Sequence, residues 1–157
     1  MVFPYRIVKA INDRTYQIYE KTLPWIKVVI FNPNKPRKTL SGLCLADTGA
    51  DLTFFDTEIG EYLGYVTKEG RLIELTGIGG GVQRAYFFEK VGIRLEDPAE
   101  KEKSIEFIDR MGFSKNNFPL SSPQQTGILG TVGFFRNVNV YFSYPEEIKI
   151  TENTNIN

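Results

Sequence analysis

Short runs of alternating apolar and polar residues occupy most of the chain and predict strands. The runs are rich in β-branched and aromatic residues, which favour pleated, half-buried backbone. They are YRIVKA, RTYQIYE, WIKVVIF, TLSGLCLA, SIEFIDRM and VNVYFSYPEEIKIT, the last predicting a hairpin around Tyr144-Pro145. Residues 32–38, NPNKPRK, predict a turn, because Asn and Pro favour turn geometry.

One segment has a different period and predicts a short helix. In FFDTEIGEYLGY, Ile59, Tyr62 and Leu63 recur at a spacing that places them on one helical face. Asp56 is suited to cap the start of this helix, and Gly64 is suited to end it.

A long hairpin is predicted after the helix, from RLIELTGIGGGVQRAYFFEKVGIRLE, with GIGGG at its tip. EDPAEKEK then predicts an exposed connection and NNFPLSSPQQTG a loop, while GILGTVGFFRN predicts a strand that passes into a helical turn. The chain contains no internal repeat and no linker. We therefore expect residues 1–157 to form a single domain, which is long enough for one sizeable core.

The charge and the cysteine content narrow the surroundings in which this chain acts. Lys plus Arg and Asp plus Glu both number 19, so the net charge is zero. A general nucleic-acid or membrane-surface role needs a basic field, and we expect neither. The longest apolar runs are too short to span a bilayer, and we expect no secretory signal. A single cysteine, Cys44, suits a reducing compartment and favours the cytoplasm.

Histidine is absent from the chain, and this limits its possible chemistry. The usual Ser-His-Asp and Cys-His mechanisms are excluded. A zinc site is not expected, because one Cys and no His leave mainly carboxylates as ligands. We therefore expect no metal. Any proton transfer falls to Asp, Glu, Lys or Tyr. Cys44 itself is predicted to be a core residue, since no base is available to activate it.

The stretch LCLADTGADLTFF places a charged group, Asp47, at the end of an apolar strand. Burying a carboxylate is costly unless it is hydrogen-bonded or neutralised. Gly49 allows a tight turn, and the hydroxyl of Thr48 is suited to brace the loop from inside. Two such carboxylates facing each other share one proton, and the pair can then activate water against a peptide carbonyl. The bland alternative is a turn aspartate that caps the backbone.

Three segments resemble the retropepsins, the retroviral-type aspartic proteases. LADTGADLT resembles their active-site motif, LTGIGGGVQ their glycine-rich flap, and ILG the apolar-apolar-Gly element beside the active-site loop. ILGTVGFFRNVNVYF is closer to standalone cellular members than to viral enzymes. The resemblance implies that Asp47 is catalytic. It implies active-site support by Thr48, Gly49, Ala50, Asp51 and Gly130, and a substrate-binding flap formed by Gly77, Ile78, Gly79, Gly80 and Gly81.

This resemblance implies an aspartic endopeptidase with an all-β fold, a small closed barrel of antiparallel strands and one or two short helices. Asp-Thr-Gly occurs once in the chain, so a homodimer must supply the second carboxylate. A polypeptide substrate would lie extended between flaps and dyad, and no cofactor is implied. The alternative is an inactive member of the fold that serves as a dimerisation or peptide-binding module.

One position departs from the family's pattern. Many viral members have Arg directly after the apolar-apolar-Gly element, paired with the acid four residues beyond the catalytic Asp. Thr131 occupies that position here, and the acid is Asp51. The ion pair is either missing or supplied by Arg136. For Asp51 we favour a structural ion pair or a contact with the substrate backbone over a catalytic role.

The glycine-rich GIGGG segment also has two alternative interpretations, a flexible loop and a phosphate cradle. A phosphate cradle needs a helix after the glycines, usually opening with Lys-Ser or Lys-Thr. VQRAYFF follows here and predicts a strand, so a flap fits better.

Overall fold

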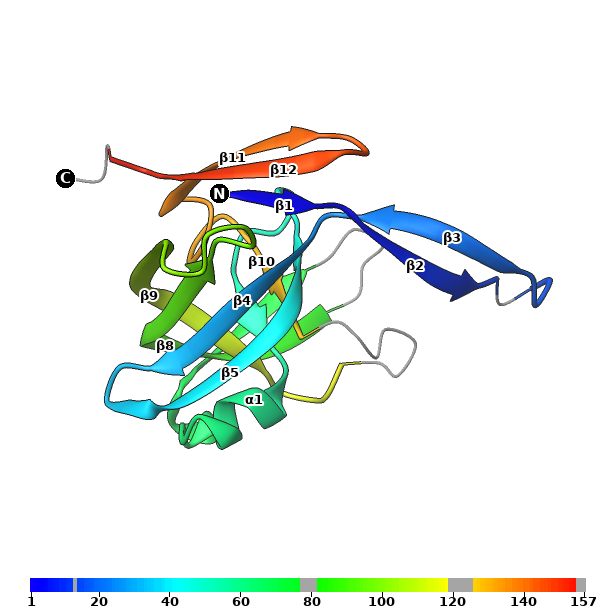
Figure 1. The fold of residues 1–157 in the computed structure, drawn as a ribbon. Coiled ribbons are helices and arrows are strands. Elements are labelled where there is room, and N and C mark those ends of the chain that lie inside the picture. Colours follow the sequence, from blue (N-terminus) through cyan, green and yellow to red (C-terminus); the bar gives the residue numbers. More distant parts are fainter. Residues whose placement is uncertain (13, 77–81, 119–125, 155–157) are drawn as a thin grey trace.

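A computed structural model describes residues 1–12, 14–76, 82–118 and 126–154, and the predicted all-β class is confirmed (Figure 1). The helical elements of these ranges are α1 (Thr57–Tyr62) and the short 3₁₀ turn η1 (Thr67–Glu69). The strands are β1 (Val2–Pro4), β2 (Arg6–Ile11), β3 (Ile18–Leu23), β4 (Trp25–Asn32), β5 (Lys35–Ala46), β6 (Phe54–Phe55), β7 (Arg71–Thr76), β8 (Val82–Glu96), β9 (Ser104–Ser114), β10 (Gly127–Leu129), β11 (Val138–Ser143) and β12 (Glu147–Glu152).

The main sheet of the described residues returns on itself. Its strand order is β4-β5-β10-β6-β9-β8-β7, and an additional pairing of β4 with β8 closes it into a ring. In that pairing Ile30 lies opposite Ile93, and Phe31 lies opposite Gly92. A Cβ on Gly92 would lie 2.2 Å from the aromatic ring of Phe31, so glycine is favoured where β4 and β8 close the sheet.

The prediction of purely antiparallel strands is wrong at two places. β10 lies parallel to β5, with Leu129 opposite Ala46, and β6 lies parallel to β9, with Phe54 opposite Gly112. Alternation along a strand reports which face is buried and carries no information about the direction of the neighbouring strand. The pattern therefore predicted the strands and not these two directions.

A second sheet, with the order β1-β12-β11, lies across one side of the ring (Figure 1). Its buried side chains Phe3, Ile148 and Ile150 belong to the same core cluster as Ile26 and Phe55 of the ring. Burial of such side chains is the main stabilising term, at about 1.5–3 kcal/mol each. The two sheets are therefore held together by one apolar core.

The predicted helix forms, with one difference in its apolar face. The carboxylate of Asp56 accepts the Glu58 N–H (2.9 Å) and caps the start of α1. Ile59 and Leu63 are buried, whereas the Tyr62 side chain is 57% exposed and does not join them. Gly64 follows the helix at a φ of +83°, a left-handed conformation that favours glycine.

Three boundaries differ from the sequence predictions. RTYQIYE begins with turn residues, and its strand starts only at Ile18. The turn predicted over residues 32–38 is shorter, since β5 already begins at Lys35. After β10 the chain forms consecutive turns in place of a helical turn, with the Arg136 N–H bonded to the Thr131 carbonyl (3.1 Å). None of the described helical segments is long or apolar enough to cross a membrane.

Candidate active site

Asp47 directly follows β5, where the sequence predicted it. Its N–H donates to the carbonyl of Leu129 (3.0 Å), which continues the parallel register between β5 and β10. Cys44 and Ala46, the last buried residues of β5, anchor the strand in the core. Because β10 lies between β5 and β6, the backbone of Asp47 is fixed within the sheet and not at a free edge.

The Asp47 side chain is oriented by the backbone of its own loop. The side-chain Oδ1 accepts the Gly49 N–H (3.0 Å), and the backbone carbonyl of Asp47 accepts the Ala50 N–H (3.1 Å). A Cβ on Gly49 would lie 3.3 Å from the same Oδ1, so a larger residue would crowd the carboxylate. Within the described residues Oδ2 has no hydrogen-bond partner, which leaves it free for water or a second carboxyl group.

Asp47 is not fully buried in the single chain, although it ends an apolar strand. The residue is half-buried, and Thr48 and Gly49 beside it are exposed. A half-buried carboxylate that accepts a backbone N–H keeps much of its hydration, so it avoids the full cost of burial. The loop therefore presents Asp47 at the surface of this chain.

Gly130 allows the close backbone approach that the ILG element predicted. A Cβ at this position would lie 2.4 Å from the carbonyl oxygen of Leu52 and 2.7 Å from that of Ala50. Both contacts are with backbone, which cannot move aside as the end of a side chain can. Glycine is thus required where the active-site loop meets the segment after β10.

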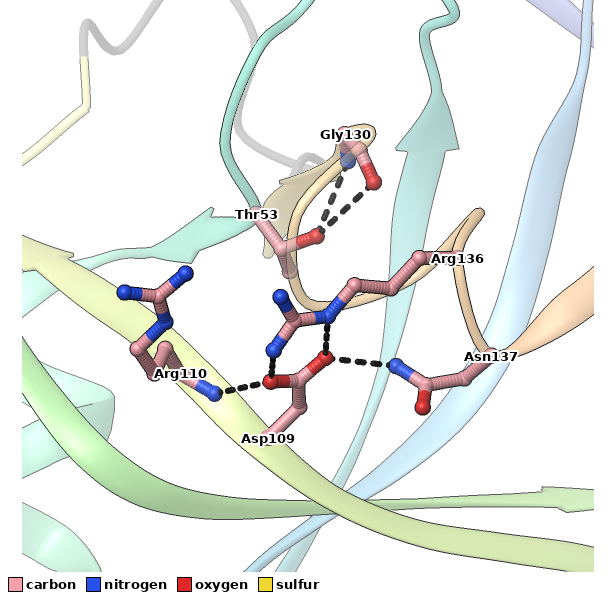
Figure 2. Close-up of polar contacts among 6 residues, drawn as sticks. All are labelled: Thr53, Asp109, Arg110, Gly130, Arg136 and Asn137. Carbon is pink, nitrogen blue, oxygen red and sulfur yellow. Dashed lines mark hydrogen bonds and ion pairs between the residues drawn. The ribbon is translucent and has the colours of Figure 1, made fainter. Parts of the chain in front are cut away.

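Thr53 is a supporting residue that the predicted set of site residues did not include. Its fully buried hydroxyl accepts the Gly130 N–H (2.9 Å) and donates to the Gly130 carbonyl (3.3 Å), as Figure 2 shows. The hydroxyl thereby satisfies both polar backbone groups of one buried glycine. The sequence signal was the Thr that ends the extended motif LADTGADLT.

Backbone hydrogen bonds join the two loops along their length. The carbonyls of Ala50 and Asp51 accept the N–H groups of Thr131 (2.8 Å) and Val132 (2.9 Å). The Thr53 N–H in turn donates to the Val132 carbonyl (2.8 Å). With these bonds the loop of residues 47–53 is tied at several points and holds Asp47 in one place.

Arg136 does not pair with Asp51, which was one of the two alternatives for this acid. Its guanidinium instead forms a two-pronged ion pair with Asp109 on β9 (Figure 2). The Asn137 amide adds a hydrogen bond to the same carboxylate (2.7 Å), as does the Arg110 N–H (2.6 Å). Asp109 is buried, so these donors offset the loss of its hydration.

Asp51 is exposed, and within the described residues its carboxylate has no ion pair. The structural ion pair considered for it is thus not found in this part of the chain. A contact with the substrate backbone stays a prediction for this residue. The Asp109 pair was not visible in the sequence, because its partners lie 27 residues apart on different elements.

A groove of about 380 Å³ opens beside the loop of residues 47–53. Its lining combines two threonines and one asparagine with mainly apolar side chains from β11 and the turn before it: Thr48, Thr131, Phe135, Val138, Asn139, Val140, Tyr141 and Phe142. Within the described residues no hydrogen bond of the Thr48 hydroxyl braces the loop, and its supporting role stays a prediction. Its side chain faces a partly apolar groove, and Thr53 is the threonine that braces the loop.

β7 and β8 form the predicted hairpin, with Arg71 opposite Phe87 and Leu75 opposite Gln83. An exposed ion pair links the two strands between Glu74 and Arg84 (2.7 Å). The predicted flap residues Gly77, Ile78, Gly79, Gly80 and Gly81 lie outside the described residues. Their role stays a prediction.

Cys44 is a core residue, as predicted. It is fully buried, and burial raises the pKa of its thiol well above the ordinary value. A thiol with a raised pKa is a poor nucleophile, so Cys44 contributes packing and not chemistry.

No family model and no curated protein matches the chain. Among solved structures, the chain is similar to the EIAV protease complexed with an inhibitor, at 23% identity and a TM-score of 0.43, over 70% of this chain and 83% of that one. It is also similar to a retropepsin-like aspartic protease from Rickettsia conorii, at 13% identity and a TM-score of 0.45, over 94% of this chain and 91% of that one. Because both TM-scores are below 0.5, the function has to be argued from the site itself.

Proposed function

We propose that this chain is one half of an aspartic endopeptidase and that a homodimer completes its active site. The observation that carries the proposal is the setting of Asp47. Its carboxylate is oriented by the Gly49 N–H, its backbone is fixed to Leu129, and its Oδ2 has no hydrogen-bond partner in the part of the chain that the structure describes. A turn aspartate that only caps the backbone does not need a loop tied so firmly to a second buried segment.

The proposed reaction needs two carboxyl groups that share one proton. The ionised group takes a proton from water, the water attacks the peptide carbonyl, and the protonated group donates to the carbonyl oxygen. Fixing both groups in advance lowers the entropic part of the barrier. The bonds between the loops at residues 47–53 and 130–132 provide this rigidity in each chain.

The second carboxylate must come from another copy, because Asp-Thr-Gly occurs only once in the sequence. A two-fold axis beside Asp47 would place the same residue of the partner opposite it. Thr48 and the apolar lining of the groove lie on this side of the loop, and a second chain would cover them. An extended polypeptide would then bind between the dyad and the flaps of the β7–β8 hairpins.

A second candidate function is a non-catalytic dimerisation or peptide-binding module with the same fold. Thr131 replaces the Arg of many viral relatives, and Asp51 has no ion pair within the described residues. That difference affects the surroundings of the site and leaves the Asp47 loop intact. We therefore place the module second.

Asp47→Asn separates the two functions. Asparagine keeps the size of the side chain but cannot act as the base or share a proton. We expect the variant to lose all cleavage of an unbiased peptide mixture between acidic and neutral pH. A binding module would keep most of its peptide affinity in the variant and would show no cleavage in the natural chain. Asp56→Asn serves as a control for the exchange of an Asp that we place outside the dyad.

A further inference from the structure

β2 and β3 form a two-stranded hairpin, the β2–β3 arm, which reaches away from the rest of the molecule (Figure 1). Its register places Ile11 opposite Ile18 and Ile7 opposite Thr22. In the described part of the chain, these two strands pair only with each other. A lone two-stranded hairpin is at best marginally stable in water, so the arm needs additional contacts.

One face of the arm carries three exposed isoleucines. Ile7, Ile11 and Ile18 are 67%, 60% and 68% exposed. They share a face because Ile7 and Ile11 are four residues apart on one strand, and Ile11 pairs with Ile18. Lys9 and Glu20 lie opposite each other on this face between the isoleucines. Such a mixture of apolar groups and both charges suits a protein surface better than a lipid one.

The arm is attached to the molecule at the active-site edge. β3 ends at Leu23, and the carbonyl of the next residue, Pro24, accepts the Ala46 N–H (3.0 Å). Ala46 is the last residue of β5 and directly precedes Asp47. The base of the arm is thus hydrogen-bonded to the residue that precedes Asp47. Under the proposed function, the carboxylate of Asp47 faces the second chain.

We propose that the β2–β3 arm grips a second copy of this chain, with Ile7, Ile11 and Ile18 packed against it. The inference rests on the proposed function, because the shared dyad places the partner across the edge where the arm is attached. A permanent partner covers the isoleucines at all times, whereas a substrate would leave them exposed after every turnover. Two-fold symmetry gives each dimer two such arms.

The first test measures whether the arm stabilises the dimer. In Ile7→Thr/Ile18→Thr, threonine keeps the preference for strands and removes apolar surface. Each dimer loses four isoleucines, and we expect its dissociation constant to rise on the order of a hundredfold by analytical ultracentrifugation. Ile108→Thr is the matched control, since this isoleucine lies on β9 and is 52% exposed. Its dissociation constant should stay near that of the natural chain.

A second test locates the arm directly. Cys44 is fully buried with a raised thiol pKa, so a photo-crosslinker attached through Gln17→Cys will label only the arm. Light and heavy isotope-labelled chains are mixed, and crosslinked peptides that join one light and one heavy chain are expected. Crosslinks confined to single chains would overturn the proposal.

The outcomes separate the arm from the catalytic proposal. If the double variant dimerises like the natural chain, the proposal that the arm grips a second copy is refuted. This also holds if the KM of the variant for long polypeptides rises, because the arm would then bind substrate. Unchanged dimerisation, with or without a raised KM, leaves the proposal of the shared dyad standing. A natural chain that dimerises through the arm and cleaves nothing refutes the endopeptidase and leaves the arm confirmed.

Discussion

A single threonine hydroxyl satisfies both backbone groups of Gly130, and this is the feature of the site most open to a chemical test. Thr53→Val keeps the shape and removes the hydroxyl, which takes away the partner of the buried Gly130 N–H, whereas the Gly130 carbonyl still accepts the Phe135 N–H (3.1 Å). We expect unfolding in urea to show that the free energy of unfolding falls by about 1–3 kcal/mol. Thr39→Val, at an exposed position of β5, should change stability by less than about 0.5 kcal/mol. Equal effects at both positions would contradict the role of the hydroxyl.

The positions of Asp47 and Gly130 could be predicted at this scale, and their supporting partners could not. Asp47 stands out because a charge ends an apolar strand, and Gly130 because it follows two apolar residues in a short motif. Thr53 and Gly130 are 77 residues apart, and their bond depends on how the loops meet. The pairing of Arg136 with Asp109 has the same cause, since these two residues are 27 positions apart and meet only in the folded chain.

Between elements, the connection from β8 to β9 contains a carboxylate that the sequence reading treated only as part of an exposed segment. Asp97 is buried and accepts the N–H groups of Ala99 (2.9 Å) and Glu100 (3.2 Å). The bond from Ala99 is the main cause that lowers the pKa of Asp97 below its ordinary value, and the bond from Glu100 acts in the same direction.

The lowered pKa predicts how this connection responds to acid. Because the folded chain favours the ionised form of Asp97, its contribution to stability is present above the unfolded pKa and is lost as the pH falls through the folded one. We expect Asp97→Asn to lower Tm at neutral pH and the difference from the natural chain to shrink as the pH falls below the ordinary pKa of an aspartate, about 3.9. Glu102→Gln, in the same connection, is the control. A difference that stays constant with pH would contradict this assignment.

Strands were predicted well where apolar and polar side chains alternate. The direction and register of neighbouring strands were predicted poorly. WIKVVIF and SIEFIDRM lie within β4 and β9, because apolar β-branched and aromatic residues favour strands wherever they pair. The insertion of β10 between β5 and β6 has no local signal. It depends on Gly127, where a Cβ would lie 2.4 Å from the Phe55 ring, and on the close approach at Gly130.

At the scale of the whole molecule, several surfaces have no explanation within one chain. They are the isoleucine face of the β2–β3 arm, the groove beside Thr48 and the Oδ2 of Asp47, which has no hydrogen-bond partner among the described residues, and the proposed second copy would cover all three. Local patterns in the sequence predicted the strands that carry these surfaces. The proposal of a partner began from the count of one Asp-Thr-Gly per chain.

A shared dyad has a quantitative consequence for mixtures of chains. If each active site joins one Asp47 from each copy, a chain with Asp47→Asn inactivates every natural chain it pairs with. Natural and variant chains are mixed, allowed to exchange fully, and kept well above the dimer dissociation constant. Random pairing makes the fraction of fully natural dimers the square of the natural fraction, so an equal mixture keeps about a quarter of the activity. Cleavage of a fluorogenic peptide measures this, and mass-labelled chains confirm the exchange. A linear dependence on the natural fraction would show that each chain works alone, and Asp47 would then have to act without a second copy of itself.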